Sequence, residues 1–174
     1  MTPAAAKYSA HERCRDGRPI EIRALRPDDR TDLLSAVGRS SAQTLYRRFF
    51  GAKRHFSERE ISYFVNVDFI SHVALVAVVE EHGQSVIVGG GRYIVLQHGE
   101  AEIAFAVVDH YQGQGIGTAL MRHLIAIARD AGLQKLTADI LSDNASMLKV
   151  FENSGLPQNT TNAAGVVHIT LRLS

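Results

Sequence analysis

The chain has 174 residues, which is enough for one ordinary domain and too few for two, so any function must reside on a single core. Hydrophobic residues make up 45% of the chain and charged residues 21%, a balance that excludes wholesale disorder. The longest unbroken apolar run, residues 73–79, is far shorter than the ~20 residues that span a bilayer. Residues 1–17 lack the apolar core of a signal peptide, so the sequence predicts a cytoplasmic protein with no membrane partner.

The counts of cysteine, histidine and charge narrow the function classes further. Cys14 is the one cysteine and has no partner for an internal disulfide, and the 8 His are scattered without paired ligand spacing, so we expect no metal site. The net charge of +1 disfavours nucleic-acid binding. That charge is uneven: residues 1–60 hold 13 Lys and Arg against 8 Asp and Glu, whereas residues 61–174 hold 6 against 10. A basic half can mark an anion or partner site in a chain that is neutral as a whole.

The first third of the chain predicts a leader, one strand and three short helices. Residues 1–18 are polar and without periodicity, so we expect a flexible leader, followed by a single domain over 19–174. Alternating apolar residues predict a half-buried strand over 20–24. Apolar residues at helical spacing over 28–50 are interrupted by Gly-Arg-Ser-Ser, which predicts two short helices. Ser57 with a glutamate three residues later resembles a capping box, which predicts a third helix.

The middle of the chain predicts an antiparallel meander. Three strand candidates, over residues 72–81, 85–96 and 101–108, follow one another with hairpin-sized turns between them. The three successive glycines at 89–91 are compatible with a second nucleotide loop, but inside a strand they favour a bulge.

After the meander, the chain alternates between helices and strands. An apolar stripe predicts a helix over residues 116–131 that ends at Gly132, followed by a strand over 135–141. Ser142 or Asp143 is expected to cap the next helix, and residues 166–173 form a final strand. This order predicts a mixed α/β fold, with one twisted sheet and helices on both faces.

The segment that carries the chemistry is a glycine-rich turn between a strand and a helix, at residues 107–118. Glycines let backbone N–H groups approach a ligand, and the helix start adds a positive dipole end, so the turn predicts a phosphate cradle. A mononucleotide P-loop fails because Ile116 follows Gly115 where Lys is required. A dinucleotide site remains a minor alternative, because the glycine spacing is GxGxG and the preceding meander disagrees with a doubly wound sheet.

Two motifs resemble those of the GNAT superfamily of N-acetyltransferases, whose turn binds the pyrophosphate of coenzyme A. Gln112-x-x-Gly115-x-Gly117 is similar to the first motif, and a later motif is matched by Asn144, Met147, Phe151, Gly155 and Leu156. The resemblance implies a splayed sheet of about seven strands, with acetyl-CoA between the strands at 101–108 and 135–141 and its thioester near residues 105–107. The cofactor-binding residues that it implies are Val107, Val108, Gln112, Gly113, Gln114, Gly115, Ile116, Gly117, Thr118, Asn144, Met147 and Phe151.

The resemblance also suggests which residues act on the amine and the thiolate. Glu102 stands in an Ala-Glu-x-Ala-Phe context similar to that of the catalytic glutamate of Pat-type bacterial protein lysine acetyltransferases, which implies a general base. The alternative is a solvent-facing strand glutamate or an ion-pair partner of Arg92. Phe151 stands where many family members carry a tyrosine that protonates the departing thiolate, and phenylalanine cannot do so. We expect a backbone N–H near Val107 to stabilise the oxyanion.

The acceptor is the least specified part of the reaction. In this superfamily the early helices border the acceptor site, and here they carry basic residues interleaved with aromatic ones: Arg47, Arg48, Phe49, Phe50, Lys53, Arg54, Phe56 and Arg59. A protein lysine is the leading acceptor, and a small amine or a non-catalytic acyl-CoA-sensing module are the alternatives. Because the cradle lies in the acidic half, we expect backbone N–H groups, rather than cations, to hold the coenzyme phosphates.

Overall fold

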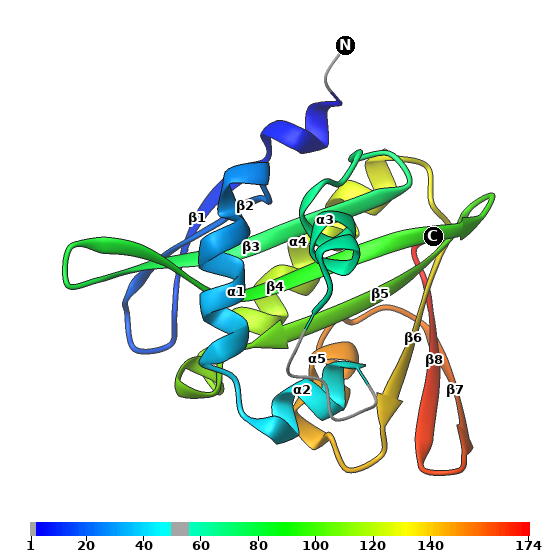
Figure 1. Ribbon diagram of the computed structural model, residues 1–174. Helices are drawn as coiled ribbons and strands as arrows, with labels where there is room; N and C mark the ends of the chain where they lie inside the picture. Colours follow the sequence, from blue (N-terminus) through cyan, green and yellow to red (C-terminus); the bar gives the residue numbers. More distant parts are fainter. Residues whose placement is uncertain (1–2, 50–55) are drawn as a thin grey trace.

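The computed structural model describes residues 3–49 and 56–174 (Figure 1). Three short 3₁₀ turns lie at Ala4–Lys7, Pro27–Asp29 and Asp109–Tyr111. The helices are α1 (Arg30–Gly38), α2 (Ala42–Phe49), α3 (Glu58–Val65), α4 (Ile116–Asp130) and α5 (Ala145–Glu152). The strands are β1 (Ser9–Arg13), β2 (Pro19–Ala24), β3 (His72–Glu81), β4 (Gln84–Gln97), β5 (Glu100–Val107), β6 (Lys135–Leu141), β7 (Gln158–Ala163) and β8 (Val166–Arg172).

Within the described residues, eight strands form one open sheet in the order β1-β2-β3-β4-β5-β6-β8-β7. Neighbouring strands are antiparallel except β5 and β6, so the predicted meander and the mixed α/β class are confirmed. Neither of the two edge strands, β1 and β7, was predicted from the sequence. The prediction of a flexible leader is wrong over Ser9–Arg13, which pairs with β2, and Gln158–Ala163 pairs with β8. Both segments are polar and mostly exposed, so they lack the alternation of apolar residues that predicts a strand.

Helices cover both faces of the sheet, as predicted. Residues 73–79 are buried on both sides because β3 is central: Val73, Leu75, Ala77 and Val79 belong to the core beneath α4, and the residues between them belong to a smaller core beneath α1. In Figure 1, α1 and α3 lie in front of the sheet and α4 lies behind it. Within the part of the chain described, no helix is both long and apolar enough to cross a membrane.

The local signals at the helix ends are mostly confirmed. Ser57 caps α3, accepting the N–H of Glu60, and the Glu60 side chain accepts the N–H of Ser57. The break between α1 and α2 lies where the Gly-Arg-Ser-Ser segment predicts it. The predicted cap of α5 is wrong by one or two positions: Asn144, rather than Ser142 or Asp143, accepts the N–H of Met147 at 3.3 Å.

The sheet opens between β5 and β6. The two strands pair in parallel only over residues 100–102 and 135–137 and then diverge toward their carboxyl ends, as Figure 1 shows. This divergence agrees with the splayed sheet that the family resemblance implies. It leaves one edge of β5 without a neighbouring strand from Ile103 onward.

The glycines of β4 serve close packing rather than nucleotide binding. A bulge lies at Val88, directly before Gly89, where the register with β3 shifts. At Gly91, an added Cβ would lie 2.6 Å from Phe105 Cδ1 and 2.9 Å from Leu124 Cδ1. Only glycine therefore lets the Phe105 ring and α4 approach this strand.

We expect Gly91→Ala to lower the free energy of unfolding by about 1–3 kcal/mol, because the added methyl group forces Phe105 and Leu124 apart. Gly90→Ala is the matched control, since its Cβ would meet only Leu75 O, at an ordinary 3.4 Å. Urea unfolding of both variants measures the difference. Equal stability of the two would show that this packing is looser than described.

Candidate active site

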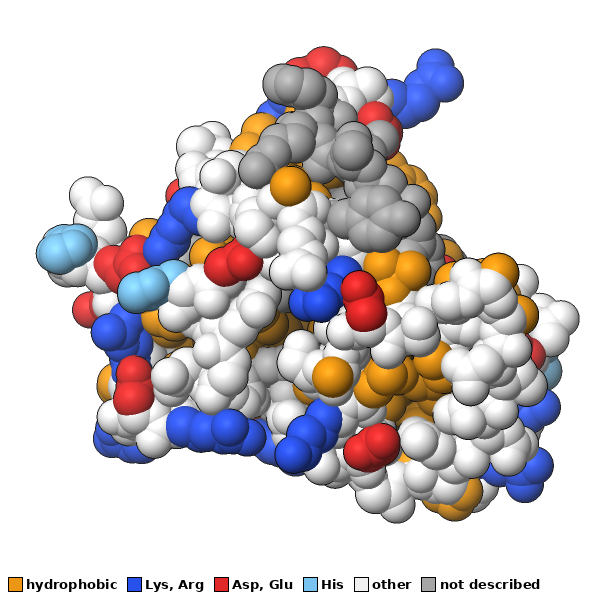
Figure 2. All heavy atoms as spheres, turned by 90° about the horizontal axis from the view of Figure 1, so that it is seen from below, with side chains coloured by type: hydrophobic (Ala, Val, Ile, Leu, Met, Phe, Trp, Pro, Cys, Tyr) orange, Lys and Arg blue, Asp and Glu red, His pale blue; other side chains and the backbone are white. Residues whose placement is uncertain are grey.

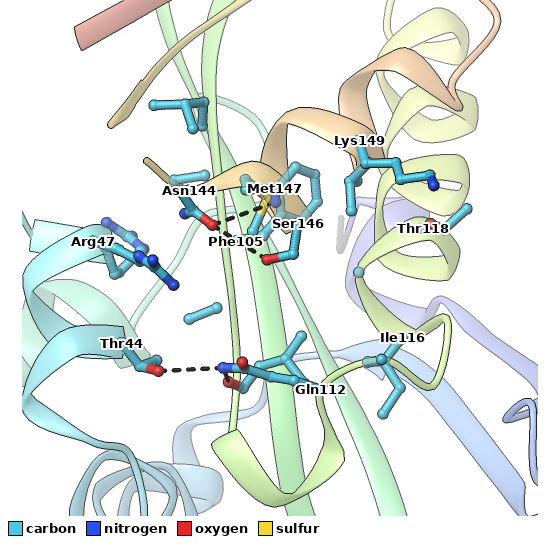
Figure 3. Close-up of a pocket in the computed structure, with 18 of the residues that line it drawn as sticks. Thr44, Arg47, Phe105, Gln112, Ile116, Thr118, Asn144, Ser146, Met147 and Lys149 are labelled. Carbon is cyan, nitrogen blue, oxygen red and sulfur yellow. Dashed lines mark hydrogen bonds between the residues drawn. The ribbon is translucent and has the colours of Figure 1, made fainter. Parts of the chain in front are cut away.

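A cavity of about 230 Å³ lies between the diverging strands. It is lined by Ile103–Val107 of β5, by the glycine turn, by α5 and by α2. In Figure 3, Arg47 of α2 points toward Asn144, the N-cap of α5, while Thr44 of α2 is joined to Gln112 of the turn. Seen along the direction of Figure 2, acidic and basic side chains surround a hollow in which apolar side chains are visible.

The glycine turn has the backbone geometry of an anion cradle. Gly113 and Gly115 have φ values of +79° and +84°, in the left-handed region that favours glycine. Gly115 is the N-cap of α4 and offers no side chain, so the first N–H groups of the helix are left for a ligand. At Gly117, an added Cβ would lie 3.3 Å from Val150 Cγ2, so this glycine lets α4 approach α5 closely.

The cavity brings together most of the residues predicted to bind the cofactor. Those that line it are Val107, Gln112, Gly113, Gly115, Ile116, Gly117, Thr118, Asn144 and Met147. Val108, Gln114 and Phe151 do not line it. The Val108 N–H is bonded to Val88 O at 2.8 Å, and Gln114 accepts the backbone N–H groups of Arg15 and Asp16, at 3.1 and 3.2 Å. Their interactions hold β5 and the turn in place.

Comparison with known proteins decides the family. Residues 39–156 match the model of the acetyltransferase (GNAT) family. The chain belongs to the GNAT acetyltransferase family. It is 35% identical over 133 residues to acetyltransferase PA5475 of Pseudomonas aeruginosa, covering 76% of this chain and 72% of that protein. It is 34% identical over 143 residues to acetyltransferase Pat of Mycolicibacterium smegmatis, covering 81% of this chain but only 42% of that longer protein.

Solved structures agree with this assignment. The GNAT domain of S. lividans PAT superposes with a TM-score of 0.86 at 31% identity, over 99% of both chains. The protein is therefore a GNAT-type enzyme that is close to the Pat type, and the predicted family and fold are confirmed.

Phe151 belongs to the hydrophobic core and does not line the cleft. Its side chain is fully buried, with its ring centroid 6.0 Å from that of Phe105 in an edge-to-face arrangement. Its contact with the cofactor stays a prediction. Asn144 both caps α5 and lines the cleft.

Glu102 lies at the point where β5 and β6 begin to separate. It is paired with Ile94 and with Thr137, is exposed, and lines neither cavity of the structure. It shares its face of β5 with Ala104 and Ala106, which line the cleft. No ion pair joins it to Arg92 within the described residues; its carboxylate instead raises the pKa of Arg48, which burial lowers more strongly.

Cations contribute to the cleft more than the sequence indicated. Arg15, Arg47, Arg48 and Lys149 all line it, and the first three come from the basic half of the chain. Arg15 lies in the turn between β1 and β2, where its Nη1 donates to Gly113 O at 3.3 Å. The cleft thus contains cations beside the backbone N–H groups of the turn, although the turn itself lies in the acidic half of the sequence. Of the predicted acceptor-side residues, Phe50, Lys53 and Arg54 lie outside the described residues.

A network of side chains ties the turn to α2. Asp109 Oδ1 accepts the N–H of Ser41 at 2.8 Å and the hydroxyl of Thr44 at 2.9 Å. Burial raises the pKa of Asp109, but these hydrogen bonds outweigh it and leave the pKa below its ordinary value. Gln112 Nε2 donates to Thr44 at 3.2 Å and to Val107 O at 3.0 Å. Sequence reasoning missed this network because its two halves are about 65 residues apart.

We expect Gly115→Ala to weaken coenzyme A binding about 10–100-fold, the effect of losing one amide–phosphate hydrogen bond of about 1.5–3 kcal/mol. Alanine also resists a φ of +84°, which costs roughly 1–2 kcal/mol of stability. Gly165→Ala is the matched control, since it has a φ of +79°, open space around its Cβ and no place in the cleft. Calorimetric titration with coenzyme A compares them, and equal affinities would exclude this turn as the phosphate site.

Proposed function

We propose that the protein transfers the acetyl group of acetyl-CoA to a primary amine, with a protein lysine as the leading acceptor, by direct attack in a ternary complex. The observation that carries the proposal is the cleft itself, which runs from the glycine turn along β5 toward Glu102. A phosphate cradle at one end and the reacting atoms at the other suit a long ligand such as acetyl-CoA. The family assignment supports the same donor.

The open edge of β5 supports binding of an extended coenzyme arm. Because the Val108 N–H points to Val88 on β4, the alternation of an antiparallel ladder directs the N–H groups of Phe105 and Val107 toward the gap. These groups lack strand partners and are suited to bond the amide-rich arm of the coenzyme and the developing oxyanion. One such donor is worth about 3 kcal/mol in the transition state.

Glu102 is the base in this proposal. A lysine amine with a pKa of ~10.4 costs about 4 to 5 kcal/mol to deprotonate at pH 7, so a nearby carboxylate accelerates attack. The amine nitrogen forms a bond to the thioester carbon, its proton passes to Glu102 directly or through one water, and the C–S bond then breaks to release the coenzyme thiolate. Glu102 lies where β5 and β6 begin to separate, two residues before Ala104 on the same face of β5, and this position supports its role.

The thiolate leaves without help from residue 151, because phenylalanine has no proton to donate. A thiol with a pKa of ~8.5 is a tolerable leaving group near neutral pH, so this departure from the common family pattern is compatible with turnover. Within the cleft lining, the cations of Arg47 and Lys149 offer the departing charge a favourable field.

Glu102→Gln is expected to lower kcat about 10²–10⁴-fold and to flatten the rise of kcat with pH, since the base is lost while the coenzyme site is untouched. Glu100→Gln is the control: the same charge is removed two residues away on the same strand, where Glu100 only accepts a bond from Gln97 at 2.8 Å. Release of free coenzyme A measures turnover. If wild-type protein binds acetyl-CoA but releases none with any amine or peptide, the protein is a sensing module rather than a transferase.

The choice of lysine is tested by incubating candidate proteins with acetyl-CoA and the enzyme, followed by peptide mass mapping. We expect a mass gain of one acetyl group on lysine side chains, which is absent with Glu102→Gln. A small-amine acetyltransferase would instead acetylate free amines and leave every protein lysine unmodified above the non-enzymatic background.

A further inference from the structure

A second cavity, of about 120 Å³, adjoins the coenzyme cleft on the face of β5 that carries Ala104 and Ala106. It lies between the sheet and helices α1, α2 and α3, and it shares Arg48, Ala104 and Ala106 with the cleft. Small residues form its floor on β4 and β5, and apolar side chains of the helices form its walls. A molecule held there can reach the thioester end of the cleft, which makes this cavity the acceptor side of the proposed reaction.

The charged side chains that line this cavity are all positive. Three arginines, Arg30, Arg48 and Arg92, line it, and no Asp or Glu does. Arg30 is paired with Glu58 at 2.6 Å. Arg92 has no carboxylate within ion-pair distance among the described residues, and residues 1–2 and 50–55 contain no Asp or Glu that could supply one. The cation on β4 is therefore not neutralised by this chain.

The contacts of Arg92 are all with neutral groups. Its Nη1 donates to Phe64 O and to His72 Nε2, each at 3.0 Å, and its guanidinium carbon lies 4.9 Å from the centre of the Phe64 ring. Burial, followed by the charge of Arg92, lowers the pKa of His72 to about 4, so this imidazole is neutral at pH 7. The remaining N–H groups of Arg92, on Nε and Nη2, have no protein partner within the described residues.

The surroundings of Arg92 favour an anion. Burial, and then the nearby Arg48, lower the pKa of Arg92 to about 9. A carboxylate would satisfy the free N–H groups in the two-pronged geometry that guanidinium prefers. Arg92 is half-buried, and charges that have lost much of their contact with water are ordinarily paired, so the missing carboxylate points to a ligand.

We propose that Arg92 binds a carboxylate carried by the acceptor, so that the favoured substrates are amines with a carboxylate close to the amine. This inference rests on the proposed function. It is supported by the register of the sheet: Arg92 lies directly opposite Ala104, which lines the coenzyme cleft, and Glu102 is the next residue along that face of β5. The carboxylate end and the amine end of one acceptor can thus lie on adjacent strands.

The carboxylate can belong to an acidic residue beside a lysine in a protein or to a free amino acid, and the experiment separates these sources. Acetylation is measured with paired acceptors: a lysine peptide with Glu next to the lysine against the same peptide with Gln, and free amino acids against their amides. Wild-type enzyme is expected to show a KM about 10–100-fold lower for the acid of at least one pair, the effect of one charged hydrogen-bonded contact. The pair that shows the preference identifies the source.

Arg92→Met is expected to abolish that preference by raising the KM of the acid alone, while the KM of acetyl-CoA changes less than twofold. Arg92→Lys retains the charge and is expected to restore part of the preference. Arg30→Met is the matched control, because it removes an arginine of the same cavity that already has a carboxylate partner. Equal loss of activity toward acid and amide acceptors in Arg92→Met would show a merely structural role and overturn the proposal.

A binding measurement separates failure of this inference from failure of the proposed function. Glutarate, which has no amine, is titrated into wild-type protein while the Nε–Hε resonance of Arg92, assigned by its absence in Arg92→Met, is followed by NMR. A saturable shift of this resonance without any acetylation supports the anion site and excludes the proposed transferase function. Acetylation without a preference for carboxylates, or no shift of the resonance up to millimolar glutarate, excludes the anion site and leaves the proposed transferase function standing.

Discussion

The short parallel pairing of β5 and β6 is the constraint on which the functional site depends. A parallel ladder that stops after Glu102 and Thr137 leaves backbone groups of β5 without strand partners among the described residues, a situation that proteins normally avoid. One of these groups, the Val107 carbonyl, is satisfied by Gln112 from the glycine turn. The others remain available to an extended ligand, which would complete the ladder in place of a strand.

The glycine turn and helix α2 form one unit around this opening. Asp109 begins the chain segment that leads into the turn, and it also accepts the N–H of Ser41 ahead of α2. Thr44, on the first turn of α2, is bonded to both Asp109 and Gln112. A shift of the turn on binding the coenzyme would therefore move the helix that separates the coenzyme cleft from the acceptor cavity. These hydrogen bonds connect the lining of one cavity with a helix that lines both.

Sequence patterns predicted what short-range physics determines. The capping box at Ser57, the stripe of α4 and the glycine turn all depend on residues within a few positions of one another, and all are present. The failures involve distant partners. The strand at Ser9–Arg13 exists because β2 offers it an edge, and Arg15 joins the cleft only because the turn after that strand lies beside Gly113. A division of charge along the sequence cannot show that the fold mixes the two halves.

The two proposed anion sites, the glycine turn and Arg92, differ in what they can distinguish. The amides of the glycine turn are neutral dipoles whose orientation is fixed by Gly113 and Gly115, so they accept any phosphate that fits, and they remain solvated without one. Arg92 carries a full charge that lies against the Phe64 ring, and burial and the charge of Arg48 lower its pKa. An acceptor with an amide in place of a carboxylate would displace water from this charge without supplying a charged hydrogen-bond acceptor in exchange. In the proposed reaction, backbone amides therefore suit the coenzyme phosphates, whereas a half-buried guanidinium suits the choice between acceptors.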